Sequence, residues 1–209
     1  MGGGVGVGAG VHRGRDRMMM ETNVEIVSEP VFAPATPVET VETVTNAVSH
    51  AVTVLPVSAR TILAAPNATD LLHTYAKHCL VSDPDPQYPL YETMESTGAF
   101  QAFAAYLNTK SGNRLIGFVG VIRTIVPHDG HLIAATESLF VDPDYRSTGA
   151  FFLLIAAAEQ FATASGCRCL LASARIGSAL DTILSRREGY EKTHNQHTRW
   201  LNGYKGGRA

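Results

Sequence analysis

The sequence predicts an α/β domain in which a mixed, mostly antiparallel sheet is flanked by helices. Three observations support this fold class: β-branched segments joined by short glycine-containing turns, apolar residues that recur with the helical period after Pro143, and a change of composition near residue 50. At 209 residues, the chain is long enough for one domain with a substantial core, and two full domains are not expected.

Residues 1–50 are predicted to form a disordered, low-complexity arm that precedes a folded domain over residues 51–209. The first twenty residues are rich in glycine and match neither a secretory signal nor an N-myristoylation signal. Residues 21–50 hold five glutamates and three prolines but no lysine or arginine, which is typical of a solvated linker. The alternation of valine with polar residues at 38–48 leaves an edge strand, or pairing with a partner, as an alternative.

The first part of the domain is expected to contain one strand and two helices. The β-branched and apolar residues of 52–63 predict a strand, and Asn67 then caps a helix over 68–80 whose apolar residues follow the helical period. A proline-rich loop comes next, and a short helix is expected over 90–100.

Three strands are expected to follow as a meander, over residues 102–109, 114–126 and 132–141. The turns between them contain Ser-Gly-Asn and His-Asp-Gly, which favour tight hairpins. Hairpins require neighbouring strands to run antiparallel, so this part of the sheet is predicted to be antiparallel.

The last part of the chain is expected to alternate helices and strands. A strongly amphipathic helix is predicted over 149–165, followed by a strand over 169–174 and a helix over 178–188 that Gly189 ends. Two weaker strands are expected at 190–194 and 197–201.

The charge balance excludes several classes of partner. The chain has 17 basic and 19 acidic side chains, a net charge of -2, so it lacks the global positive field that attracts nucleic acid or an anionic membrane. No apolar run reaches the roughly 18 residues of a spanning helix. We therefore expect no nucleic-acid partner and no membrane partner.

Cysteine and histidine usage predicts neither disulfides nor a metal. Three cysteines, Cys79, Cys167 and Cys169, are too few for a disulfide framework, so reduced thiols and a cytoplasmic location are expected. His194 and His197 have the spacing of half a metal site, but no cysteine or carboxylate stands at ligand spacing from them.

One strand-to-helix junction has the composition of an anion site. A strand ending at Val141 is followed by Pro143, then by a Tyr145-Arg146-x-x-Gly149 turn that opens directly into a helix. Such a turn directs unpaired backbone N–H groups and the positive end of the helix at one point, where a pyrophosphate binds well. An ordinary corner without a ligand is the alternative.

The stretch from Glu137 to Gly149, ESLFVDPDYRSTG, resembles the acetyl-coenzyme A site of the GCN5-related N-acetyltransferase (GNAT) family. The order of predicted elements is similar to that of the family's fold. Three short motifs also resemble those of family members: Ala158-Glu159, Ser165-Gly166 and the ending Arg187-Glu188-Gly189-Tyr190. The resemblance covers about residues 52–202. It implies a GNAT fold, acetyl-CoA as co-substrate, and direct transfer of the acetyl group to an amine on a small molecule or a protein.

The resemblance also implies a set of cofactor-binding residues. Backbone N–H groups at the end of the fourth strand would polarise the acyl carbonyl, and the turn would hold the pyrophosphate. Phe151 departs from the family pattern Gln/Arg-x-x-Gly-x-Gly/Ala, and a helical aromatic side chain leans toward the helix N-terminus, where the pyrophosphate would sit. The full set is Leu139, Phe140, Val141, Arg146, Ser147, Thr148, Gly149, Ala150 and Phe151.

Two further residues are assigned to catalysis by the same resemblance. Removing the proton from an alkylammonium of pKa about 10.4 at pH 7 costs roughly 4 to 5 kcal/mol, so a general base is useful. Glu137 occupies the position from which many relatives project a carboxylate toward the amine, and a solvent-facing strand residue is the alternative. The family's usual asparagine and acid tyrosine are replaced by Ser178 and Ser185, and Ser185 could only orient a water.

Other assignments remain open at this level. His73 and His78 lie on a helix that often borders the acceptor cleft in this family, so one of them could touch substrate. A catalytically degenerate GNAT-fold binding or assembly module is the alternative function, with Phe151, Ser178 and Ser185 as the lost positions. Short acetyltransferase-like proteins of tailed phages similarly lack the tyrosine, which leaves a viral origin open, and a homodimer is a further option.

We predict that residues 1–50 are dispensable for folding, because their composition buries too little apolar area to offset chain entropy. Limited proteolysis should trim the arm and leave a stable core, and the truncated protein should keep the thermal transition of the full chain. A protected arm, or the loss of that transition on truncation, would instead favour the edge-strand alternative.

Overall fold

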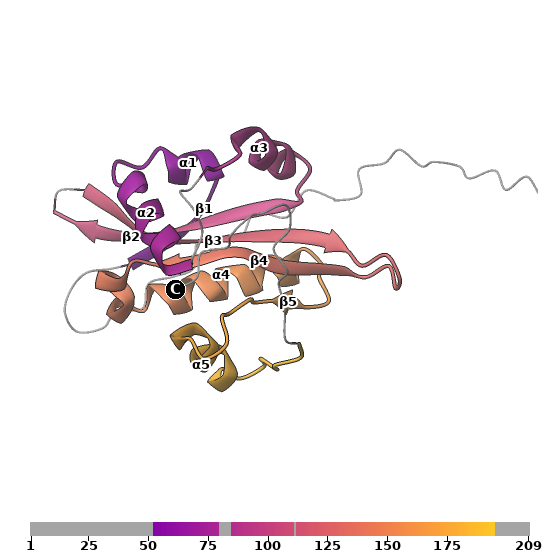
Figure 1. Cartoon of the computed structure of the whole chain (residues 1–209). Coiled ribbons are helices and arrows are strands. Elements are labelled where there is room, and N and C mark those ends of the chain that lie inside the picture. The colour runs from indigo at the N-terminus through magenta and orange to yellow at the C-terminus, as the bar shows by residue number, and fades with distance from the viewer. Residues whose placement is uncertain (1–51, 80–84, 111, 195–209) are drawn as a thin grey trace, which may run out of the picture. The chain divides into compact units, whose positions relative to one another are not determined.

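The computed structural model describes residues 52–79, 85–110 and 112–194, which form a five-stranded sheet with helices on both faces (Figure 1). The predicted arm over residues 1–50 and the strand predicted at 197–201 lie outside the described residues. In the described part, α1, α2 and α3 cover one face of the sheet, and α4 lies along the other (Figure 1). The predicted α/β fold class is confirmed.

The strands lie in the order β1-β2-β3-β4-β5. The first four pair antiparallel, as the predicted meander requires, whereas β5 pairs parallel to β4. β1 is therefore at one edge of the sheet that the described residues form, and its Pro56 lies opposite Phe103 of β2. The strands are β1 (Val52–Val57), β2 (Phe100–Thr109), β3 (Gly112–Ile125), β4 (Leu132–Val141) and β5 (Leu170–Leu171).

The strand predicted over 52–63 is wrong in its second half, because the chain turns into a short helix, α1 (Ala59–Leu63). Ser58 ends the extended segment and caps the helix: its hydroxyl accepts a hydrogen bond from the N–H of Thr61 at 3.1 Å. Ala59 and Ile62, three residues apart, then share the buried face of one helical turn. The cap outweighs the strand preference of the residues that follow it.

The two helices after α1 match the predictions unequally. The helix α2 (Ala68–Cys79) begins where expected. The helix α3 (Tyr88–Ser96) begins two residues before the predicted 90–100 and ends four residues before its end. Gly98 adopts φ 70°, a left-handed conformation that ends the helix, and Phe100 is recruited as the first residue of β2.

The C-terminal half contains a 3₁₀ helix, η1 (Pro143–Thr148), then α4 (Ala150–Ala164) and α5 (Ala179–Arg186). The strand predicted over 169–174 is shorter in the structure. It consists of the two residues of β5, which pair with Ala134 and Ala135 of β4. The strand predicted at 190–194 is wrong: these residues have no regular structure.

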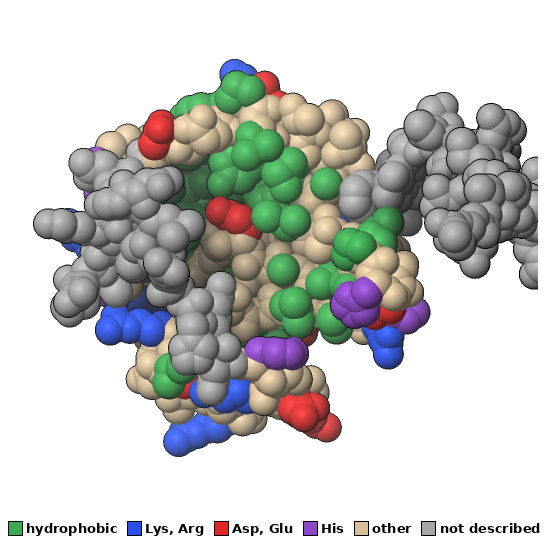
Figure 2. Space-filling model, turned by 45° about the vertical axis from the view of Figure 1, so that its right-hand side comes forward, with side chains coloured by type: hydrophobic (Ala, Val, Ile, Leu, Met, Phe, Trp, Pro, Cys, Tyr) green, Lys and Arg blue, Asp and Glu red, His purple; other side chains and the backbone are tan. Residues whose placement is uncertain are grey.

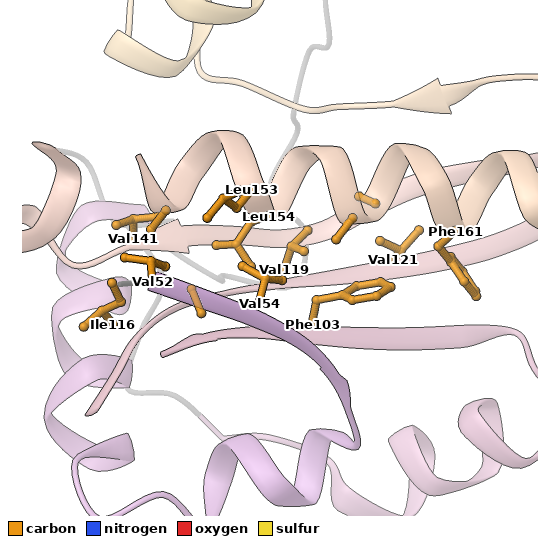
Figure 3. Close-up of a cluster of buried hydrophobic side chains, with 14 of the residues drawn as sticks. Val52, Val54, Phe103, Ile116, Val119, Val121, Val141, Leu153, Leu154 and Phe161 are labelled. Atoms are coloured by element: carbon orange, nitrogen blue, oxygen red, sulfur yellow. The ribbon is translucent and has the colours of Figure 1, made fainter. Parts of the chain in front are cut away.

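Two hydrophobic clusters, one on each face, hold the sheet between its helices. The first lies under α4, and Phe103 and Phe161 pack edge to face in it with ring centroids 6.0 Å apart. The second lies under α1, α2 and α3, with Phe118 and Phe140 at its centre. Side chains of the first cluster include Val52, Val54, Ile116, Val119, Val121, Val141, Leu153 and Leu154 (Figure 3).

We predict that Leu154→Ala lowers the free energy of unfolding by about 2 to 5 kcal/mol, because it removes buried methyl groups and leaves a cavity. Leu154 is 0% exposed in the centre of α4. The same substitution at Leu171, which is 45% exposed on β5, is the matched control and should have a much smaller effect. Urea unfolding measures both, and equal losses would contradict the placement of α4 on the core.

Candidate functional site

Glu137 is the extra residue of a β-bulge in the middle of β4. Ser138 lies opposite Gly120 of β3 and Thr136 lies opposite Val121, so Glu137 has no partner of its own in the register. A bulge bends the strand and turns a side chain away from the regular alternation. The bulge therefore determines where the Glu137 carboxylate lies.

The carboxylate of Glu137 lies over a glycine, on the face of the sheet that α1, α2 and α3 cover. A Cβ atom added at Gly120 would be 3.1 Å from Oε2 of Glu137 and 2.9 Å from Cε2 of Phe100. The glycine thus leaves room for both side chains. The Glu137 side chain is solvent-exposed, as the alternative interpretation expected, but it also has these specific neighbours.

Tyr91 of α3 contacts the same carboxylate. Its hydroxyl donates a hydrogen bond to Oε1 of Glu137 at 3.3 Å, and its ring packs on Phe100 with centroids 5.0 Å apart. Burial raises the pKa of Tyr91 to about 12, and the negative charge of Glu137 and the hydrogen bond to it act in the same direction. The hydroxyl therefore stays protonated, as a donor, throughout the neutral range.

The helix α3, which carries Tyr91, also exposes apolar side chains. Exposed large hydrophobic side chains of α3 include Tyr88 and Leu90. Figure 2 shows hydrophobic side chains gathered beside an acidic group and next to a hollow in the surface. Sequence reasoning did not single out Tyr91, Phe100 or Gly120, although a glycine inside a β-branched strand is a known sign of a bulge or of a close approach.

Two backbone N–H groups at the end of β4 point to its β5 side. The N–H of Asp142 donates to the carbonyl of Ile116 in β3 at 2.9 Å, and alternation along the strand therefore directs the N–H groups of Leu139 and Val141 away from β3. No acceptor for these two groups is found among the described residues. The N–H of Phe140 faces β3, and its side chain is buried in the cluster under α2.

The turn after β4 leaves further N–H groups free at the start of α4. Gly149 adopts φ 81° and ψ 0°, which ends η1 and begins α4 without a side-chain cap. Thr148 accepts a weak hydrogen bond from the N–H of Ala150 at 3.3 Å. Within the described chain, no acceptor is found for the N–H groups of Gly149 and Phe151, so the positive end of α4 is available to an anion.

The side chains of Arg146 and Phe151 flank this turn. Nε of Arg146 donates to the carbonyl of Val141 at 3.3 Å, and the residue as a whole is exposed. The ring of Phe151 is partly buried against the cluster under α4 and meets the ring of Phe152 edge to face, with centroids 5.2 Å apart. Part of the Phe151 ring is therefore committed to the core.

Ser178 directly precedes α5, and Ser185 lies within it. Ser178 is the N-cap residue of that helix, and its hydroxyl accepts from the N–H of Asp181 at 3.1 Å. Ser185 is exposed, and no contact brings it to Glu137 in the part of the chain that the structure describes. After α5, Arg187 donates two hydrogen bonds to Glu159 of α4, at 3.0 and 2.8 Å, and this pairing raises the pKa of Arg187.

The remaining candidates form no second site among the described residues. His73 and His78 are exposed on α2, and the His78 ring lies 6.0 Å from that of Phe140. No group of three potential metal ligands is found in the described ranges, and His197 lies outside them. None of the described helices is both long and apolar enough to cross a membrane.

The bulge in β4, the two-residue pairing of β4 with β5 and the uncapped N-terminus of α4 all lie between Leu132 and Leu171. A model of the acetyltransferase (GNAT) family matches residues 68–178, which is more than half of the chain. The chain therefore belongs to this family of N-acetyltransferases, and the predicted GNAT fold is confirmed. Acyl transfer is the chemistry of the family.

Solved structures with this fold include acetyltransferases of several kinds. An aminoglycoside acetyltransferase, meta-AAC0020, from an uncultured soil metagenomic sample is 18% identical with a TM-score of 0.57, over 72% of this chain and 97% of that chain. A ribosomal-protein-alanine N-acetyltransferase from Brucella melitensis is also 18% identical with a TM-score of 0.52, over 72% and 99%. AAC(6')-Iy in complex with a CoA bisubstrate analog is 19% identical with a TM-score of 0.53, over 72% and 98%. No curated protein sequence matches the chain.

Proposed function

We propose that this protein transfers the acetyl group of acetyl-CoA to an amine acceptor by direct attack of the amine. The observation that carries this proposal is the bulge in β4, which aims Glu137 at one face while the next residues of the strand keep N–H groups on the β5 side. A base and a set of donors for an acyl oxygen thus stand within a few residues of each other. Membership of the acetyltransferase family supports acyl transfer in general.

The residues of the β4–α4 turn suit the anionic part of acetyl-CoA. Free N–H groups at Gly149 and Phe151, the positive end of α4 and the guanidinium of the exposed Arg146 would bind the pyrophosphate. The N–H groups of Leu139 and Val141 would polarise the thioester carbonyl. Acetyl-CoA, when bound, supplies an activated acyl group, so no covalent intermediate on the protein is needed.

Glu137 would act on the acceptor. An ammonium group must lose a proton before its nitrogen can attack a carbonyl, and the exposed Glu137 carboxylate would take that proton directly or through a water. Ser185 is proposed only to orient a water, since a hydroxyl on the exposed surface of α5 is a poor acid. The acceptor class is an amine on a small molecule or on a protein, and the free Cys167 and Cys169 suit a reducing, cytoplasmic location.

We predict that acetyl-CoA raises the thermal stability of the protein, by RT ln(1 + [L]/Kd), which is about 2.7 kcal/mol when the ligand is a hundredfold above Kd. The N–H groups and positive helix end at the β4–α4 turn provide the binding energy. A thermal shift assay with millimolar acetyl-CoA, and with sodium acetate as the ligand control, measures the effect.

A pair of glycine variants localises this binding. Gly149→Ala and Gly130→Ala both place a Cβ in open space at a positive φ, 81° and 70°, so both should lose similar stability through backbone strain. Only Gly149→Ala should weaken the stabilisation by acetyl-CoA. If the parent showed no shift while Phe151→Gly did, the aromatic ring would be blocking the site, and the noncatalytic alternative would be favoured.

We predict that Glu137→Gln lowers the acetylation rate by roughly a hundredfold or more at pH 7, because the amide cannot accept the ammonium proton. Part of the rate should return at high pH, where free amine is abundant. The assay follows thiol release from acetyl-CoA with spermidine, kanamycin and an alanine-initiated peptide as acceptors. Ser185→Ala should have a much smaller effect, and an unchanged rate and pH profile in Glu137→Gln would remove its catalytic role.

A further inference from the structure

We propose that Tyr91 is a positioning residue, whose hydroxyl holds one oxygen of the Glu137 carboxylate so that the other oxygen faces the acceptor amine. This proposal rests on the proposed function, because it assigns Tyr91 a role through Glu137. Tyr91 lies 46 positions before Glu137 in the sequence, and the 3.3 Å hydrogen bond between their side chains joins α3 to β4.

Glu137 needs such a partner because of where it stands. It is an exposed side chain with several rotatable bonds, on an unpaired residue of a bulge. Among the described residues, the Tyr91 hydroxyl is the one hydrogen-bond donor found for its carboxylate, and no ion pair reaches it. Without that bond, the carboxylate would sample several rotamers, and the entropy of orienting it would add to the barrier.

Two kinds of contact fix the position of Tyr91. Its ring packs against Phe100, which is 4% exposed. The helix that carries it is tied to α1 by two glutamates: Glu95 accepts from the N–H of Ala59 at 2.6 Å, and Glu92 pairs with Arg60. The hydroxyl is therefore presented from a fixed helix and not from a loop.

A neutral hydroxyl is a suitable hydrogen-bond donor to a carboxylate that acts as a general base. Tyr91 is neutral, so it orients the carboxylate without neutralising the charge that takes up the proton, as a lysine or an arginine would. With its pKa raised to about 12, its hydroxyl remains a donor at any pH at which the enzyme would work. The bond uses Oε1, and Oε2 lies over Gly120 with no hydrogen-bond partner among the described residues. The proton lost by the ammonium group would pass to Oε2.

An experiment that does not depend on turnover tests the contact first. In protein labelled with ¹³C at glutamate carboxyl carbons, the resonance that disappears in Glu137→Gln belongs to Glu137. Tyr91→Phe should shift that resonance at pH 7.5, and Tyr88→Phe, on the same helix and 43% exposed, should not. A Glu137 resonance that is the same in Tyr91→Phe as in the parent would overturn the proposal.

Kinetics then test the role. With the best acceptor among spermidine, kanamycin and an alanine-initiated peptide, Tyr91→Phe should lower kcat about tenfold and leave the KM for acetyl-CoA and the melting temperature unchanged. Tyr91→Phe added to Glu137→Gln should cause no further loss, because the tyrosine acts only through the glutamate. Tyr88→Phe should behave like the parent.

Two kinetic results would contradict this role. A further loss on combining the variants would show that Tyr91 acts independently of Glu137, and a fall in melting temperature parallel to the loss of kcat would show a purely structural effect. If none of the three amines is acetylated by the parent, the proposed function fails, and the carboxyl resonance alone decides whether Tyr91 holds Glu137.

Discussion

A single extra residue in β4 determines most of what is distinctive in this molecule. Glu137 has no partner in β3, which is the pattern of a bulge that bends a strand, and the described residues of β5 pair with β4 at Ala134 and Ala135. Beyond the bulge, no strand is found beside β4 on its β5 side among the described residues, and the Glu137 carboxylate lies over Gly120. The position of the carboxylate over Gly120 thus follows from one irregularity of the strand.

The secondary-structure elements that depend on neighbouring residues were predicted correctly from the sequence. Short stretches of sequence determine the turns between β2, β3 and β4 and the apolar period of α4. The structure has all of these elements. The end of β1 was missed because the Ser58 cap prevails over strand preference. The strand expected at 169–174 was too long because its length is set by pairing with β4, where Ala134 and Ala135 are the partners, and that pairing is not local to position 170.

The candidate site divides in the same way. Arg146, Gly149 and the start of α4 follow one another in the chain, so their geometry could be inferred from a motif, and Glu137 precedes them by a few residues. Tyr91 and Phe100 come from a helix and a strand far away in the sequence, and only folding brings them to Glu137. Gly120 alone offered a signal, as a small residue in a buried strand.

Pro56 gives the opposite edge of the sheet a different property. It lies in β1, at the edge of the sheet formed by the described residues, and it has no N–H to offer to an incoming strand. An extended segment from another molecule could not form a continuous ladder along that edge. The proline thus protects the sheet against edge-to-edge aggregation while new chains are folding and their strands are briefly uncovered.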